Sequence, residues 1–173
     1  APYLVELKPA GDAYRPGQLL RAGRLKRYEG VENGEWKFLM WDAKEGRPKM
    51  PLGSVGFRWG SEKGKWNLLH QDGVDGSEID PALTFLNSSE AVVQVQLDDF
   101  GEGRVLRRGV PVRRVELATG ETAIVATVYD LLMAQYGVPR GLDGQYPEDY
   151  QDENLPYTPA WAEKYTGIGP GRG

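Results

Sequence analysis

The sequence predicts an α+β fold made mainly of short antiparallel strands and hairpins, with two or three short helices. Glycine and proline account for 23 and 12 of the 173 residues, and so many turn-forming residues disfavour a helical bundle. Several apolar runs alternate with polar residues at the period of two that half-buried strands have. Two segments near the C-terminus instead carry helix start and stop signals.

The first part of the chain is expected to hold two strands and one helix. Residues 2–7 alternate as a short strand, and the run Trp-Lys-Phe-Leu-Met-Trp at 36–41 is typical of a second. A hairpin turn is expected at 43–46 because Gly46 follows three polar or small residues. Between these strands, 15–27 is expected to form a short helix that begins at its proline.

The middle of the chain is expected to add strands joined by tight turns. Asp72-Gly73 and Asp75-Gly76 are turn signals. In the run at 91–97, valines and a leucine alternate with glutamines, which predicts one buried and one solvated face. The strand-like runs are 54–60, 65–69, 81–86 and 91–97.

The clearest hairpin signal precedes the first C-terminal helix. Val112, Val115 and Leu117 predict one strand, and 123–128 returns as a β-branched run after a Thr-Gly reversal. Residues 128–136 then predict a helix that ends at a glycine.

A second helix is predicted over 158–167. Thr158 is a good N-cap, Pro159 suits the first helical position, and Gly167 ends the helix. Before it, 143–153 holds five acids and no base, which predicts an irregular, exposed loop.

Composition excludes several classes of function for this chain. The sequence contains no cysteine and one histidine, so thiolate zinc sites, cysteine-ligated iron–sulfur clusters and thiol nucleophiles are excluded. A net charge of −4 argues against nucleic-acid binding. No apolar run approaches the roughly 20 residues that span a bilayer. The first 27 residues carry six bases and two acids, which predicts a solvated face or a docking face for an acidic neighbour.

Two acidic motifs are candidates for metal or acid–base sites. Asp98 and Asp99, with Glu102 nearby, are adjacent on a strand and therefore point to opposite faces. Asp72 and Asp75 lack the downstream glutamate that a calcium loop needs at its last position. Solvated acids and hairpin turns explain both motifs better than a metal does.

Other candidates also have structural interpretations. His70 has no partner in the sequence, so a surface residue is favoured over a general base. The segments 53–56 and 141–144 lack the pattern of a nucleotide-binding loop. The tryptophans serve either a sugar-binding groove or a core with interface anchors; they are Trp36, Trp41, Trp59, Trp66 and Trp161. We therefore assign no catalytic and no metal-binding residue, and the cofactor-binding residues stay unassigned.

Several long motifs resemble the catalytic (alpha) subunit of membrane-bound respiratory nitrate reductases, in the molybdopterin oxidoreductase superfamily. The resemblance is strongest in Gly-Ser-Val-Gly-Phe-Arg-Trp-Gly at 53–60 and Glu-Lys-Gly-Lys-Trp-Asn-Leu at 62–68. It continues in the same order along the chain. The further similar segments are 109–117, 126–131, 136–142 and 157–168, with weaker similarity at 4–7 and 16–22.

The resemblance implies that residues 1–168 are one internal segment of a larger catalytic subunit, and part of its larger fold. It implies that the full subunit reduces nitrate to nitrite at molybdenum held by two molybdopterin guanine dinucleotides, and binds a 4Fe-4S cluster. Its partners would be the remainder of the alpha subunit, an iron–sulfur beta subunit and a haem-bearing membrane subunit. The subunit would be membrane-associated through them, on the cytoplasmic face.

Within that family the segment is expected to be structural, inactive alone and without a cofactor of its own. The alternative is a stand-alone β-rich binding module that uses exposed aromatics for a carbohydrate or protein ligand. Because the chain begins without methionine, we expect both ends to be cuts, with 169–173 a disordered or non-native tail.

The sequence departs from the family pattern at 97–104, where an aromatic stretch is replaced by Leu-Asp-Asp-Phe and the following loop is shortened. Arg58, Lys63 and Lys65 are candidates for contacts to an anionic cofactor. A hairpin with solvated lysines is the favoured interpretation.

Overall fold

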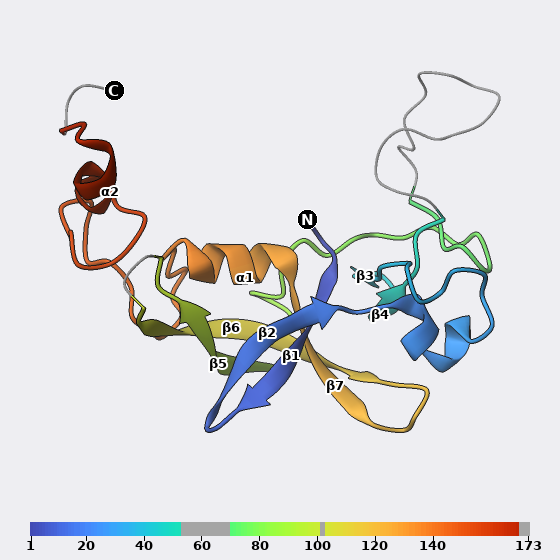
Figure 1. Cartoon of the computed structure of the whole chain (residues 1–173). Coiled ribbons are helices and arrows are strands. Elements are labelled where there is room, and N and C mark those ends of the chain that lie inside the picture. The colour runs from blue at the N-terminus through green and yellow to red at the C-terminus, as the bar shows by residue number, and fades with distance from the viewer. Residues whose placement is uncertain (53–69, 101–102, 170–173) are drawn as a thin grey trace, which may run out of the picture.

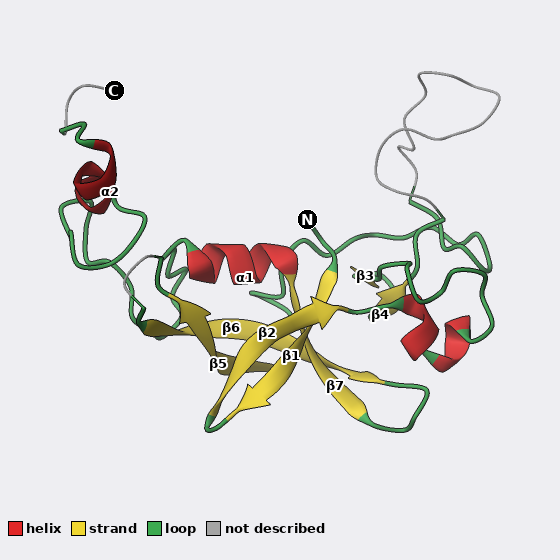
Figure 2. Cartoon of the chain, in the orientation of Figure 1, coloured by secondary structure: helices red, strands yellow, loops and turns green. Residues whose placement is uncertain are grey.

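The computed structural model describes residues 1–52, 70–100 and 103–169. Its centre is a closed five-stranded barrel with the order β1-β2-β5-β6-β7. The helix α1 lies across this barrel, and α2 lies at one end of the molecule (Figures 1 and 2). The barrel strands are β1 Leu4–Ala10, β2 Ala13–Leu19, β5 Ala91–Asp98, β6 Val105–Glu116 and β7 Thr122–Thr127. The α+β class with mainly antiparallel strands is confirmed.

The long strand β6 bends from one barrel neighbour to the next. Its residues 105–112 pair with β5, from Asp98↔Val105 to Ala91↔Val112, and its residues 113–116 pair with β7. The strand β7 in turn pairs antiparallel with β1. The predicted strands at 2–7 and 91–97 and the hairpin around Thr119-Gly120 are confirmed. One pairing is parallel, between β2 and β5 at Tyr14↔Val95.

The predicted helix at 15–27 is wrong. Residues 13–19 form β2, and only two short 3-10 helices follow, η1 Ala22–Arg24 and η2 Lys26–Tyr28. Pro16 pairs with Leu7 beside a register shift in β1. At Gly17 an added Cβ would lie 2.6 Å from the backbone oxygen of Glu6. The Pro-Gly pair therefore fits an irregular strand, with the glycine allowing a close backbone approach.

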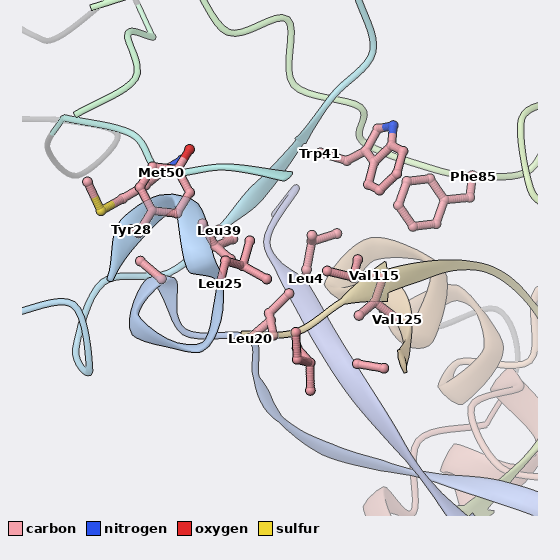
Figure 3. Packing of buried hydrophobic residues seen from close by; sticks show 13 residues of the cluster. Leu4, Leu20, Leu25, Tyr28, Leu39, Trp41, Met50, Phe85, Val115 and Val125 are labelled. Carbon is pink, nitrogen blue, oxygen red and sulfur yellow. The ribbon is translucent and has the colours of Figure 1, made fainter. Parts of the chain in front are cut away.

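A second, two-stranded sheet lies beside the barrel. It consists of β3 Met40–Asp42 and β4 Arg47–Lys49, joined by the predicted turn at 43–46. The expected strand at 36–41 is thus shorter and lies further along the chain. Figure 3 shows the core that joins this sheet, the 3-10 helices and one end of the barrel. Its large members are Leu4, Leu20, Leu25, Tyr28, Leu39, Trp41, Met50, Phe85, Val115 and Val125.

The predicted strand at 81–86 is wrong, although Phe85 in it is fully buried. Only an isolated bridge, Asp42↔Pro81, is present in this segment. Two backbone N–H groups in and beside it donate to carboxylates, Asp80 N to Asp42 and Phe85 N to Asp130. The Ala82 N–H donates to the Trp41 carbonyl, so the segment has separate hydrogen-bond acceptors and no continuous strand partner. The predicted runs at 54–60 and 65–69 lie outside the described residues.

Both predicted C-terminal helices are confirmed. The helix α1 spans Val128–Gln135 with Thr127 as N-cap, and α2 spans Pro159–Thr166 with Thr158 as N-cap. The hydroxyl of each cap accepts a backbone N–H of the first turn, as N-caps do. Neither α-helix in the described ranges has the length and apolar character that a bilayer crossing needs.

Candidate functional site

The aspartates of the 72–76 turn bind their own loop. Asp72 is buried and accepts the Val74 N–H at 2.9 Å and the Tyr28 hydroxyl. Asp75 accepts the Ser77 N–H at 2.9 Å and pairs with Arg27. The carboxylates therefore stabilise a turn, as the sequence predicts.

The Asp98-Asp99 pair is split between two faces. Asp98 is exposed, whereas Asp99 is buried and accepts the Arg104 Nε at 2.6 Å. This arrangement does not form a carboxylate pair for acid–base work. Glu102 lies outside the described residues.

The remaining sequence candidates are dispersed. His70 is half-buried, and its backbone oxygen accepts the Ile79 N–H. Trp41 is buried edge-on against Phe85, with ring centroids 5.6 Å apart. At Gly144 an added Cβ would lie 2.7 Å from the Cα of Arg108 in β6, so the close approach of the two backbones requires a glycine. The segment 53–69 lies outside the described residues; it contains Arg58, Trp59, Lys63, Lys65 and Trp66.

The predicted basic patch of the first 27 residues is partly neutralised within the chain. Arg24 pairs with the buried Glu6, and Arg27 pairs with Asp75. Arg15 donates to the side chain of Gln96 at 2.9 Å. These bases therefore hold their own fold together.

A fully buried lysine is the first charged group that the sequence did not indicate. The Lys49 ammonium lies 2.9 Å from an Asp42 carboxylate oxygen and 2.6 Å from one of Glu45. It also donates to the Ser77 hydroxyl and the Glu78 carbonyl, each at 3.0 Å. Burial lowers the pKa of Lys49, but the two carboxylates outweigh it and hold the pKa above its usual value. The cation therefore joins β3 and β4 to the 77–78 loop.

Asp130 forms a second buried centre at the start of α1. Its carboxylate accepts the Phe85 N–H at 2.8 Å, the Thr127 hydroxyl at 2.9 Å and the Thr84 hydroxyl. The Arg140 guanidinium completes the shell at 2.8 Å. Because Asp130 stands three residues after the cap, the Thr-x-x-acid spacing was a usable signal for the local part of this contact.

Arg108 forms a third centre, at the other end of α1. Its guanidinium donates to the carbonyl oxygens of Ala134, Gln135 and Gln145 at 2.6–2.9 Å. Burial lowers the pKa of Arg108. Carbonyls at a helix C-terminus carry partial negative charge and stabilise a cation there. Arg108 therefore fixes the end of α1 and the following loop to β6.

These three centres are suited to holding loops in place. Each charge is bound by backbone groups, hydroxyls or opposite charges. The amine beside Ser77 is held protonated and the carboxylate beside Thr84 is paired with Arg140, so neither is free to act as a base. Among residues 1–52, 70–100 and 103–169, no group of three His, Cys, Asp or Glu side chains is placed to hold a metal. The described residues therefore do not fit a metal or cluster, and we derive no chemical step through one.

A strip of aromatic rings connects the barrel to α2. Tyr157 lies between Tyr136 and Trp161, with ring centroids 5.1 and 5.4 Å away. Phe100 and Tyr165 extend the strip beyond the indole, at 5.7 and 4.8 Å from it. Tyr157 adopts a φ of 74°, an unfavourable conformation for a bulky residue. The ring contacts on both sides hold it there.

Comparison with known proteins gives homologues over nearly the whole chain. The chain is 42% identical to the respiratory nitrate reductase 1 alpha chain of Escherichia coli K12 over 96% of its length. It is 38% identical to the nitrate reductase alpha subunit of Mycobacterium tuberculosis H37Rv and 34% identical to the nitrate reductase alpha chain of Bacillus subtilis 168, each over 96%. The chain spans only 13–14% of the length of these relatives. No protein-family model matches it.

Proposed function

We propose that this chain is one segment of a nitrate reductase alpha subunit and that the segment has a structural role in it. The observation that supports this is the similarity to nitrate reductase alpha chains over 96% of the chain and only about one seventh of each relative. The full subunit would reduce nitrate to nitrite at molybdenum held by two molybdopterin guanine dinucleotides. A 4Fe-4S cluster would bring the electrons.

The role proposed for this segment follows from its buried charges. Lys49, Asp130 and Arg108 each join a long loop to a strand or helix through bonds that water does not reach. Each of these charges hydrogen-bonds to a backbone group of a loop, and such a bond favours one loop conformation because leaving it unmade in a buried site is costly. The segment would thus provide a rigid covering layer for a catalytic core that other residues of the subunit form.

The proposed partners follow from the same assignment. They are the remainder of the alpha subunit, an iron–sulfur beta subunit and a haem-bearing membrane subunit. Membrane association would then be indirect, through those subunits, at the cytoplasmic face. The names of the relatives support an alpha-chain assignment.

Purified protein tests the proposal in two forms. The full-length protein that contains this segment should oxidise a reduced viologen dye when nitrate is added and should contain molybdenum by elemental analysis. The 173-residue chain alone should show neither property. Nitrate turnover by the isolated chain, or a full-length protein without nitrate turnover when loaded with molybdenum, would refute the proposal. Saturable binding of a soluble carbohydrate by the isolated chain would favour the stand-alone module instead.

A further inference from the structure

The negative charge of the chain is concentrated in residues 141–169, which we call the acidic arm. This segment holds six acidic residues and one lysine, a net charge of −5, whereas the whole chain carries −4. The remaining residues therefore sum to +1. In the described residues, no ion pair joins the carboxylates of the arm to a base. The acids with exposed side chains are Asp143, Glu148, Asp149, Glu153 and Glu163.

Apolar side chains lie exposed along the same arm and where it meets the barrel. Tyr165 and Ile168, at the end of α2, are 52% and 58% exposed. Phe100, which follows β5, and Tyr136, which follows α1, are 57% and 50% exposed. Exposed apolar patches with a charged rim are typical of protein interfaces, where aromatic residues are enriched. Figure 1 shows α2 standing away from the barrel, so this face is accessible to a partner.

The charge of the arm selects among possible partners. Anionic lipid surfaces and nucleic acids are both repelled by a net charge of −5. A second copy of the chain is disfavoured because its residues outside the arm carry a net charge of only +1, and Arg24 and Arg27 are already paired with Glu6 and Asp75. A basic protein surface would satisfy both the carboxylates and the exposed rings.

We infer that the acidic arm, with Phe100 and Tyr136, is a docking face for a protein surface that bears lysine and arginine side chains around an apolar centre. This surface belongs to a part of the assembly outside residues 1–173. The ring strip fixes α2, Ile168 and Tyr165 enter the apolar centre, and the carboxylates pair with the basic rim. The inference rests on the proposed function only in taking the full-length protein as the material for the test.

Cross-linking of the full-length protein tests the inference. A photoreactive benzoylphenylalanine replaces Ile168, and in a control protein it replaces Val74, which is 53% exposed on a turn away from the arm. A zero-length carbodiimide, which couples carboxylates to lysine amines, is applied in parallel. We expect the probe at 168 and the carboxylates of the arm to couple to one lysine-bearing surface outside residues 1–173. The probe at 74 should not reach that surface.

Charge variants test the electrostatic part with a matched control. Three arm acids are neutralised in one protein, and three exposed acids near the N-terminus are neutralised in the other. The arm set is Glu148→Gln, Asp149→Asn and Glu153→Gln; the control set is Glu29→Gln, Glu32→Gln and Glu35→Gln. We expect the photoproduct at 168 to fall about tenfold in the arm variant and to be unchanged in the control. Salt near 1 M, where the Debye length is about 3 Å, should lower the photoproduct yield of the protein with intact arm acids to that of the arm variant.

Other outcomes overturn the inference. Products between two copies of residues 1–173 would assign the face to self-association, and coupling to lipid would assign it to a membrane. No product at 168, or a salt-independent product on a surface without bases, would also refute it. Nitrate reduction is measured on the same preparations. Its absence would count against the proposed function, whereas the cross-links report on the arm alone.

Discussion

Truncation of Asp130 should be among the most destabilising single changes in the described part of the chain. In Asp130→Ala the buried Phe85 N–H loses its acceptor at 2.8 Å, and the Arg140 guanidinium loses its carboxylate. The hydroxyls of Thr84 and Thr127 can rotate, so their lost bonds to Asp130 contribute less to the destabilisation. A buried donor without a partner costs about 1–3 kcal/mol, and removing one member of a buried ion pair costs about 3–5 kcal/mol in all.

We therefore expect Asp130→Ala to lower the free energy of unfolding by about 3–5 kcal/mol. Asp130→Asn keeps an oxygen for the Phe85 N–H and should lose only about 1.5–3 kcal/mol, the value of a hydrogen bond to a charged group. Thr127→Ala removes the helix cap and the hydroxyl that donates to Asp130, and should cost about 1–2 kcal/mol. Urea titration followed by circular dichroism measures all three free energies of unfolding. An unchanged m-value shows that each variant exposes the same surface on unfolding as the wild type, so the free energies can be compared.

A double-mutant cycle isolates the ion pair within this centre. Arg140→Gln is combined with Asp130→Ala, and the loss in the double variant should be smaller than the sum of the single losses by at least about 1 kcal/mol. Two results would refute the reasoning. One is a loss below about 1 kcal/mol for Asp130→Ala, and the other is strict additivity in the cycle.

Three further substitutions test other contacts by the same unfolding measurement. Burial raises the pKa of Asp42, but the bond from Lys49 and two backbone N–H groups hold it below its usual value; Lys49→Met should therefore cost about 3–5 kcal/mol at pH 7. The stability that the lowered pKa contributes is complete above about pH 4 and is lost as the pH falls through the lowered pKa of Asp42, so the cost should shrink over that range. A constant cost would contradict this account. Burial and the bond to Asp72 raise the pKa of Tyr28 to about 12, so its contribution is complete below about pH 10 and is lost towards pH 12; Tyr28→Phe should abolish that alkaline loss. Gly17→Ala should destabilise by about 1–3 kcal/mol because its Cβ would meet a backbone oxygen at 2.6 Å, and a neutral effect would show that β1 and β2 can separate there.

Local patterns were sufficient for the elements whose partners are near in sequence. The caps at Thr127 and Thr158 are satisfied within three residues, so their helices could be placed from sequence alone. The strand at 91–97 was equally predictable because its alternation reflects one buried face. The segment at 81–86 has a similar apolar content, but its Ala82 and Phe85 N–H groups donate to the Trp41 carbonyl and to Asp130, which no local pattern indicates.

The docking face was only half predictable. The run of acids in 143–153 is visible in the sequence, and the structure confirms an irregular, largely exposed loop there. The ring strip brings Phe100 and Tyr136 to α2 across separations of 61 and 21 residues to Trp161 and Tyr157. Such separations have no signature in a single sequence.

The sequence by itself determined the α+β class, the turns, the two capped helices and the absence of cysteine ligands, because each depends on residues close together or on composition. Only the tertiary structure decided that 13–19 is a strand, that five strands close into a barrel, and that Lys49, Asp130 and Arg108 are buried. The physical reason is that burial of a charge depends on what the rest of the chain brings to it. Lys49 meets Ser77 28 residues away, and Asp130 meets Phe85 45 residues away.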